Sequence, residues 1–279
     1  MSTTHCLNCG EFFGPSAKFC SACGQTTATH RLTIGHLLHE VFHAVTHADK
    51  GIFNLVKILA TRPYKVAIDY VEGSRKKYFN PVTFFLHCVG TFIFINSVAK
   101  LFGDVVKPDP KVVAQIPTEA GRQNYIALAT RSGEANAFMS KNTNIVSMIA
   151  VPFYAGLIWL FFRRRGRKLS EIMLAVILFT AFSTLLFTLV VTPVMGYYRG
   201  QPMYFYVLIT GLVLQMVYYT WGFVPFLGYR KAGGYLKVFA VMILTAVCWT
   251  LIAMLLVLYY ISRENTGKVI GAIWNKMIS

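Results

Sequence analysis

The 279-residue chain is 55% hydrophobic and only 14% charged, and its mean hydropathy is +0.52. Ordinary soluble domains carry about 25% charged residues, so the composition excludes a soluble domain, a disordered tail, a secreted disulfide scaffold and a collagen-like fibre. The 27 Lys and Arg against 11 Asp and Glu give a net charge of +16. In a membrane protein this excess bears on orientation more than on solubility.

Long stretches without charged residues set the fold class. A helix needs roughly 20 apolar residues to cross a bilayer, because it rises about 1.5 Å per residue. Five stretches reach this length: 78–99, 142–162, 172–198, 200–229 and 238–262. We therefore expect an all-α membrane protein of about five transmembrane helices, with a small N-terminal cytoplasmic zinc ribbon and short amphipathic helices.

Four cysteines near the N-terminus form two pairs with the spacing of zinc ligands. The motifs are Cys6-x-x-Cys9-Gly10 and Cys20-x-x-Cys23-Gly24. Each pair offers two thiolates, and the following glycine lets the backbone curl around a metal. Four thiolates fill a tetrahedral site, so we expect one structural Zn²⁺ per chain and a zinc ribbon over residues 1–30. The pattern also indicates a reducing compartment.

Residues 31–81 are expected to form a cytoplasmic, amphipathic and basic helical segment. Helical spacing gathers apolar residues on one face of 34–47. Two further helices are expected over 51–61 and 64–72, because Arg62-Pro63 and Gly73 are typical of helix boundaries. The basic and aromatic stretch 75–81 then indicates the headgroup level at the start of the first span.

The sequence His39-Glu40-Val41-Phe42-His43 matches the H-E-x-x-H motif of zinc peptidases. In this alternative His39 and His43 bind a second zinc, and Glu40 activates its water. The third ligand would come from another acidic or imidazole group: His36, His47, Asp69 or Glu72. The stretch is His-rich and lacks the longer metzincin pattern, so a solvated polar helix face is the competing interpretation.

Residues 82–279 are expected to form the transmembrane helical bundle, with 104–142 as an extracytoplasmic loop. One short helix is expected in this loop, around 118–130. Pro152, Pro193 and Pro225 fall inside the second, third and fourth spans and should kink them. The tail 263–279 has apolar residues at helical spacing, which predicts a short helix lying on the far leaflet.

The distribution of basic residues predicts the orientation. With five spans and a cytoplasmic N-terminus, seventeen of the 27 Lys and Arg fall on the cytoplasmic side. The run Arg163-Arg164-Arg165-Gly166-Arg167-Lys168 directly follows the second span and is the strongest local signal. No apolar leader precedes the first span. We expect a multi-pass protein of the bacterial inner membrane with a cytoplasmic N-terminus.

Basic and aromatic side chains alternate in the N-terminal third. A single-stranded nucleic acid or nucleotide would use the cations for phosphates and the aromatic rings for base stacking. The candidate ligand-binding residues are Lys18, Arg31, Arg62, Lys65, Arg75, Lys76 and Lys77, with Phe12, Phe13 and Phe19 beside them. Attraction to anionic lipid headgroups is the competing interpretation of the cations near the membrane.

Several of these motifs resemble a family of uncharacterised bacterial multi-pass membrane proteins with an N-terminal zinc ribbon, grouped by a domain of unknown function. The matching residues are the two cysteine pairs with Lys18-Phe19 and Gln25, then Asp49-x-Gly51, Arg62-Pro63 and Glu72-Gly73-x-Arg75-x-x-Tyr78-x-Asn80-Pro81. They cover about residues 5–85, and Thr61 departs from the family pattern. The resemblance implies an architecture and no biochemistry.

A looser similarity, of architecture only, is to membrane effectors of bacterial antiphage systems of the Hailong type. There, a short single-stranded DNA made by a partner nucleotidyltransferase holds an oligomeric channel shut. The leading hypothesis is therefore a homo-oligomeric membrane ion channel or antiviral effector, gated by an anionic ligand at the zinc-ribbon cap. The alternatives are the zinc metallopeptidase and a membrane adaptor whose ribbon recruits a protein.

Overall fold

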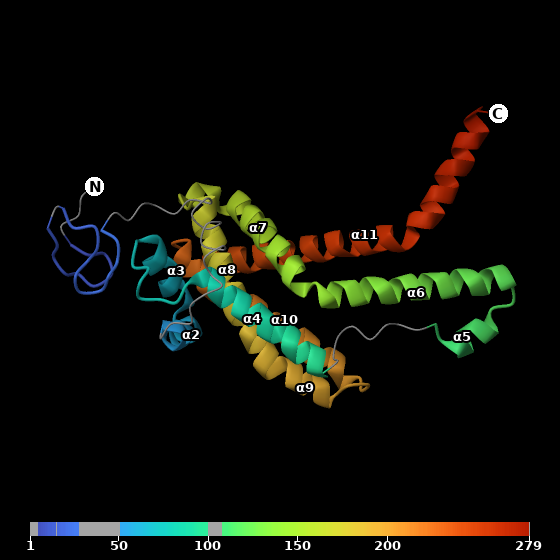
Figure 1. Ribbon diagram of the computed structural model, residues 1–279, viewed down its shortest axis with the longest axis horizontal. Helices are drawn as coiled ribbons and strands as arrows, with labels where there is room; N and C mark the ends of the chain where they lie inside the picture. The colour runs from blue at the N-terminus through green and yellow to red at the C-terminus, as the bar shows by residue number, and fades with distance from the viewer. Residues whose placement is uncertain (1–4, 15, 28–50, 100–107, 279) are drawn as a thin grey trace. The chain divides into compact units, whose positions relative to one another are not determined.

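The computed structural model describes residues 5–14, 16–27, 51–99 and 108–278 (Figure 1). Within these ranges the regular structure is helical, apart from two isolated bridges that pair His5 with Phe12 and Phe19 with Thr26. The expected all-α class is confirmed. The helix predicted over 34–47, with its histidines, lies outside the described residues.

The helices and short helical turns follow one another along the chain. They are α2 (Gly51–Thr61), α3 (Pro63–Val71), α4 (Pro81–Ala99), α5 (Pro110–Gln115), α6 (Glu119–Lys141), α7 (Thr143–Phe162), η1 (Arg163–Arg165), α8 (Leu169–Leu186), η2 (Phe187–Val191), α9 (Thr192–Tyr197), α10 (Met203–Phe226) and α11 (Ala232–Ile278).

Five segments of the described chain are long and apolar enough to cross a membrane. They are Pro81–Val98, Ile145–Arg165, Leu169–Tyr197, Met203–Phe226 and Ala232–Tyr260. Each overlaps one of the five uncharged stretches of the sequence, so the predicted number of spans is confirmed.

The chain divides into two compact units, one built from 1–92 with 147–245 and the other from 93–146 with 246–279. In the first unit α8 is the central helix. Its Ile172, Leu174, Leu178 and Phe179 have no exposed surface, and α2, α3 and α10 pack against it. The ring of Phe179 meets Phe223 of α10 edge to face, with 5.0 Å between ring centroids.

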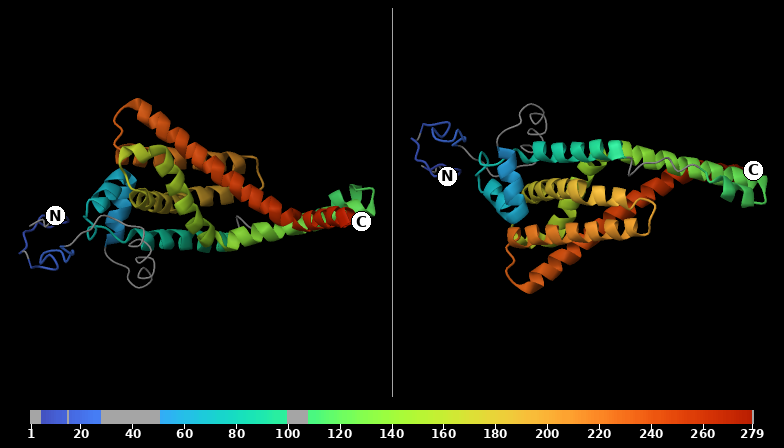
Figure 2. Two further views of the ribbon diagram at one scale, coloured as in Figure 1. Left: turned by 90° about the horizontal axis from the view of Figure 1, so that it is seen from above. Right: turned by 90° about the horizontal axis from the view of Figure 1, so that it is seen from below.

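Two connections of the first unit lie against each other. Arg167, just before α8, donates from Nε to the carbonyl oxygen of Phe226 at the end of α10, at 3.2 Å. Arg165 lies 3.7 Å from the ring centroid of Tyr229, which follows α10. The end of α7, the start of α8, the end of α10 and the start of α11 therefore share one end of this unit, as spans that alternate in direction require (Figure 2).

Pro193 coincides with a change of helical register. A wide π-helical turn, η2, covers Phe187–Val191 immediately before α9. Proline has no N–H to donate, and single π turns are a known way to accommodate a local break in the hydrogen-bond pattern. Gly211 of α10 lies opposite, where a Cβ would come within 2.9 Å of Val191. The glycine therefore lets the two backbones approach.

The second unit contains the connection expected to lie outside the cytoplasm. Asp109 caps α5 by accepting from the N–H of Lys111 at 2.9 Å, and Thr118 caps α6. The helix expected around 118–130 begins where predicted and continues to Lys141. Within the same unit the Tyr260 hydroxyl donates to Glu134 at 3.2 Å.

The tail is helical, as expected, but it continues the helix of the last span, because α11 runs from Ala232 to Ile278. Its place on the far leaflet stays a prediction. The sequence from 260 to 278 contains no proline, and charged residues alone do not end a helix. Hydropathy marked the end of the apolar stretch and not the end of the helix.

Candidate metal centre and its contacts with the membrane entry

The two cysteine pairs adopt the same backbone geometry. Cys6 donates from its N–H to Glu11 and accepts from the N–H of Gly10, and Cys20 makes the equivalent bonds with Gln25 and Gly24, each at 2.8 Å. Gly10 and Gly24 have φ of 82° and 69°, in the left-handed region that favours glycine. The residues after each pair thus bend the chain back around its two thiols.

The four thiols converge at one point. The Sγ atoms of Cys6, Cys9, Cys20 and Cys23 all lie within 4.8 Å of one another. Cys6 is 3.5 Å from Cys23, and Cys9 is 3.6 Å from Cys20. Tetrahedral zinc with bonds of about 2.3 Å separates its sulfur ligands by roughly 3.8 Å, so the donor set fits a closed four-thiolate site. The four cysteines are free of disulfides.

The surroundings of the thiols affect their ionisation unequally. Burial disfavours the Cys6 thiolate, but hydrogen bonds from the backbone N–H groups of Cys9 and Asn8 outweigh it and lower the Cys6 pKa to about 7. At Cys9 the backbone N–H of Glu11 favours the thiolate. Desolvation and the three neighbouring thiols oppose it and raise the Cys9 pKa to about 12. Thiolates this close together repel one another, and a bound cation removes that repulsion.

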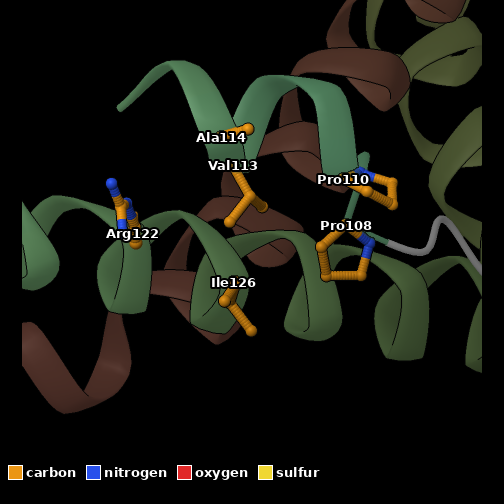
Figure 3. Close-up of a pocket in the computed structure, with 6 residues that line it drawn as sticks. All are labelled: Pro108, Pro110, Val113, Ala114, Arg122 and Ile126. Atoms are coloured by element: carbon orange, nitrogen blue, oxygen red, sulfur yellow. The ribbon is translucent and has the colours of Figure 1, made fainter. Parts of the chain in front are cut away.

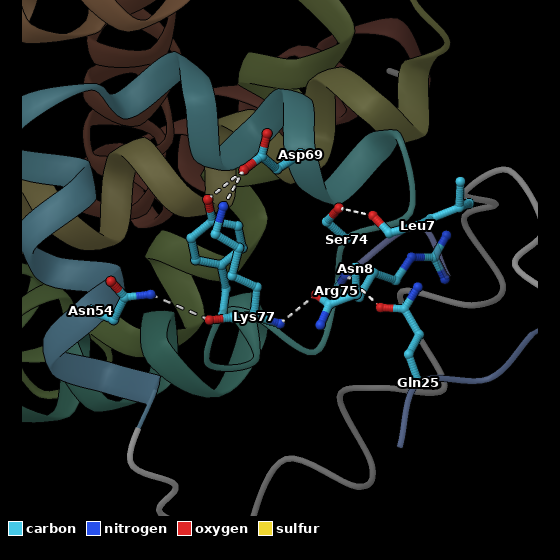
Figure 4. A network of polar contacts seen from close by, with 9 residues as sticks. Leu7, Asn8, Gln25, Asn54, Asp69, Ser74, Arg75 and Lys77 are labelled. Atoms are coloured by element: carbon cyan, nitrogen blue, oxygen red, sulfur yellow. Dashed lines mark hydrogen bonds and ion pairs between the residues drawn. The ribbon is translucent and has the colours of Figure 1, made fainter. Parts of the chain in front are cut away.

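The residues around the thiols bind the turn that leads to α4 (Figure 4). The buried side chain of Gln25 donates to the carbonyl oxygen of Gly73 at 2.6 Å and accepts from the N–H of Arg75 at 3.2 Å. Asn8 accepts from the N–H of Lys77 at 3.0 Å, and the Ser74 hydroxyl donates to the carbonyl oxygen of Leu7. The cysteine ribbon (5–27) is therefore joined to the entry turn (73–78) by residues within or next to each of its two cysteine pairs.

The entry turn is also tied to α2 and α3. Asp69 of α3 accepts from the Tyr78 hydroxyl at 2.6 Å and pairs with Lys77 at 3.1 Å. Burial, with the hydrogen bond and negative charge of Asp69, raises the pKa of Tyr78. Asn80 then caps α4 by accepting from the N–H groups of Val82 and Thr83 at 2.9 and 3.1 Å. The start of the first span is thus rigidly defined.

The predicted ligand-binding cations have different surroundings. Lys18, Arg62, Lys65 and Lys76 are exposed and make no ion pair within the described residues. Lys77 is paired with Asp69, while Arg75 is half-buried with its guanidinium 5.8 Å from the ring centroid of Tyr70. Arg31 lies outside the described residues.

Two of the predicted stacking residues project from the cysteine ribbon. Phe12 is 70% exposed and Phe19 is 62% exposed, while Phe13 is partly buried. The Phe12 ring lies against the His5 ring, with 4.2 Å between their centroids. Base stacking would use the exposed remainder of the Phe12 ring and the Phe19 ring.

The peptidase alternative falls on His39, Glu40 and His43, which lie outside the described residues. Of the acidic residues considered as a third ligand, Asp69 is hydrogen-bonded to Tyr78 and paired with Lys77. In the part of the chain that the structure describes, the cysteine cluster is the only group of three or more side chains arranged to hold a metal.

Asn8, Gln25 and Ser74 join the ribbon to the entry turn, and sequence reasoning gave them no role. Gln25 follows Gly24 in the motif of the family that the sequence resembles, and that position is the one sequence feature that points to it. Its partners are 48 to 51 residues away, so spacing could not identify them.

A pocket of about 680 Å³ lies between α5 and α6 (Figure 3). It is lined by Pro108, Pro110, Val113, Ala114, Arg122 and Ile126. Its one cation, Arg122, already donates to the carbonyl oxygen of Ile116 and pairs with Glu119. Part of the Arg122 guanidinium is therefore already engaged by residues of the same two helices and their connection.

Five membrane-length helices within the described chain, preceded by a four-cysteine cluster, define a multi-pass membrane protein with a candidate structural metal site. Residues 49–94 match the model of a family described as a protein of unknown function, DUF3667. The match covers α2, α3, the entry turn and most of α4, and it includes part of the motif that the sequence had indicated. No curated protein and no solved structure matches the chain.

Proposed function

We propose that this protein is a homo-oligomeric membrane channel or effector whose cytoplasmic ribbon binds an anionic nucleotide or single-stranded DNA and thereby controls the membrane helices. The observation that carries the proposal is the set of hydrogen bonds between the entry turn and the side chains of Gln25 and Asn8. A ligand that shifts the ribbon would act directly on the start of α4.

The charge distribution supports an anionic ligand. Lys18, Arg62, Lys65 and Lys76 are exposed cations without ion pairs in the described chain, and the Phe12 and Phe19 rings offer stacking surfaces. Phosphates would bind the cations and bases the rings. The ligand would change the population of open and closed states by its difference in affinity for them.

The experiment measures binding and flux on the full-length chain. Fluorescence anisotropy of a short single-stranded DNA is recorded across a salt series, and ion flux is recorded from proteoliposomes with and without that DNA. We expect binding that weakens steeply with salt and a flux that changes when the DNA is added. No binding at low salt together with no flux in either condition would overturn the proposal.

Matched variants separate the two kinds of contact. Arg62→Gln/Lys65→Gln/Lys76→Gln should weaken binding of all DNA sequences about equally, whereas Phe12→Ala/Phe19→Ala should remove only the stacking contribution. Lys111→Gln is the control, because Lys111 is an exposed cation of the other compact unit. Binding to anionic liposomes without affinity for DNA would favour simple lipid attraction.

The proposal extends to the cellular setting. An antiviral effector of this kind would be encoded beside a nucleotidyltransferase that makes its ligand, and would reside in the inner membrane with its N-terminus in the cytoplasm. Loss of function in Glu40→Gln with zinc content and fold intact would favour the metallopeptidase instead. Capture of a specific protein by the ribbon, without flux, would favour the adaptor.

A further inference from the structure

A second group of cations lies on the two connections that meet at one end of the first unit and on the adjoining start of α11. The loop cluster consists of Arg163–Arg165, Lys168, Arg230, Lys231 and Lys237. All seven are exposed, and none forms an ion pair within the described residues. The only acidic residue between 163 and 237 is Glu171, which is fully buried and pairs with Arg167 at 3.8 Å. Nothing on these connections neutralises the cluster.

Aromatic rings hold two of these cations in place. The Arg165 guanidinium lies 3.7 Å from the ring centroid of Tyr229. Tyr229 meets Phe162 edge to face at 6.0 Å, and the Lys237 ammonium lies 5.7 Å from the Phe162 ring centroid. The two rings thus position one cation from the α7–α8 connection and one from α11. Cation–π contacts fix the side chains but leave their charges unneutralised.

A glycine makes room for this arrangement. At Gly234 a Cβ would come within 2.6 to 2.7 Å of the Tyr229 side chain. Any larger residue would therefore push Tyr229 away from its place between Arg165 and Phe162.

The cluster adjoins exposed apolar side chains of the membrane-spanning segments. Leu160 and Phe161 end α7 with 51% and 44% of their surface exposed, and Leu236, beside Lys237, is 72% exposed. A cationic group next to the apolar surface of membrane spans matches an amphiphile, with its anionic head on the cations and its chains on the leucines. Because the bilayer covers that apolar surface with acyl chains, a lipid headgroup is the anion held nearest to the cations.

We infer that the loop cluster is a binding site for a phospholipid whose headgroup carries two phosphates. Seven like charges on adjoining connections repel one another, and a dianionic headgroup neutralises more of them for the same loss of translational freedom than a monoanionic one. Basic pockets between membrane helices bind cardiolipin-type headgroups by this chemistry. The site uses none of the residues of the entry turn and does not depend on a nucleotide ligand.

The test uses the full-length chain in detergent. Bound lipid is counted by native mass spectrometry, and thermal stability is followed as cardiolipin, phosphatidylglycerol or phosphatidylcholine is added at equal phosphate concentration. We expect cardiolipin to bind most tightly and to stabilise the protein most. Equal affinity for phosphatidylglycerol would overturn the two-phosphate assignment. Equal affinity for inorganic diphosphate would overturn the lipid assignment.

Variants locate the site. Arg165→Gln/Lys237→Gln should weaken cardiolipin binding by about 30-fold, given the usual contribution of a basic residue near an anionic headgroup. Lys111→Gln/Arg199→Gln removes the same charge elsewhere and should bind as the wild type does. Unchanged binding in the first variant would overturn the proposal. If that variant does not fold, Arg164→Gln/Lys231→Gln replaces it, because neither side chain contacts a ring in the described part of the chain.

The positioning role of the ring is tested without changing charge. Tyr229→Leu and Gly234→Ala should both weaken cardiolipin binding, while Tyr229→Phe, which keeps the ring, should retain it. Wild-type affinity in Tyr229→Leu would show that charge alone binds the lipid and would overturn the ordered site.

Discussion

The side-chain amide of Gln25 donates to the carbonyl oxygen of Gly73, although 48 residues separate the two along the chain. Gln25 is buried and stands two residues after Cys23, whereas Gly73 begins the turn that leads to the first membrane helix. The side-chain oxygen Oε1 of Gln25 also accepts from the N–H groups of Arg75 and Lys76. One side chain therefore satisfies three backbone groups of the entry turn, and its position depends on the fold around the cysteines.

Gln25→Ala should separate the ribbon from the entry turn without removing the metal. The cysteines are untouched, so zinc content should stay at one per chain, while three hydrogen bonds of about 1 kcal/mol each are lost. Hydrogen exchange at residues 73–77 should accelerate by tenfold or more. Ser21→Ala, an exposed position of the same cysteine pair, is the control. Unchanged exchange in Gln25→Ala would contradict the coupling.

Cys6→Ser/Cys9→Ser should release the metal and unfold the ribbon, because two of four ligands are lost and metal binding supplies the folding energy of such small sites. The membrane helices satisfy their own backbone groups and should stay folded. Zinc analysis and circular dichroism provide the measurements, with Cys88→Ala, outside the cluster, as the control. Full zinc occupancy in the double variant would refute the assignment of ligands.

The number of spans and the cysteine site could be predicted from the sequence because both depend on local patterns. A run of uncharged residues needs no partner to identify it, and the two Cys-x-x-Cys-Gly motifs encode their own turns. The start of α4, which Asn80 caps and where Pro81 occupies the first helical position, is equally local. These features would be the same in any context, and the structure contains all of them.

The remaining features depend on contacts between distant segments. The stacking of Arg165 on Tyr229 joins two connections that are 64 residues apart, and the run 163–168 by itself indicates only the orientation of the spans. The π turn at Phe187–Val191 becomes understandable only beside Gly211 of α10. Periodicity describes one helix at a time, so it cannot identify which faces meet.

The shared end of α7, α8, α10 and α11 gives the topology a direct test. Single cysteines placed at positions 164 and 231 in a cysteine-free background should show the same accessibility to a membrane-impermeant thiol reagent as one at position 76. Cysteines at positions 111 and 201 should show the opposite. We expect the first group to face the cytoplasm because of its basic residues. Labelling of positions 111 and 76 from the same side would refute the five-span arrangement.

Gly222→Ala should destabilise the first unit. The added Cβ would lie 2.8 to 3.1 Å from the ring of Phe179, which is fully buried and packed against Phe223, so it cannot move freely. Overpacking of this kind costs about 1–3 kcal/mol. Gly156→Ala is the matched control, since nothing lies within 4 Å of its Cβ and alanine is the better helix former. Thermal unfolding in detergent should show a lower midpoint only for Gly222→Ala.

The ion pair between Arg167 and Glu171 provides the last prediction. Glu171 has no exposed surface, and its carboxylate accepts from the N–H of Lys168 at 3.3 Å as well as pairing with Arg167. Arg167→Met should destabilise the protein, because a buried carboxylate loses its counter-charge and Phe226 loses its hydrogen-bond donor. Breaking a buried pair costs about 3–5 kcal/mol, and less here because Arg167 is partly exposed.

Glu171→Gln added to Arg167→Met should recover much of that stability. The amide removes the buried charge but keeps an oxygen that can accept from the Lys168 N–H, so the contacts of Arg167 with the carbonyl and ring of Phe226 are the losses that stay. Arg164→Met, which removes an exposed cation of the same connection, should unfold at the wild-type temperature. The three variants are compared by thermal unfolding in detergent. If the double variant were no more stable than Arg167→Met alone, the cost would come from the lost contact with Phe226 and not from the unpaired carboxylate.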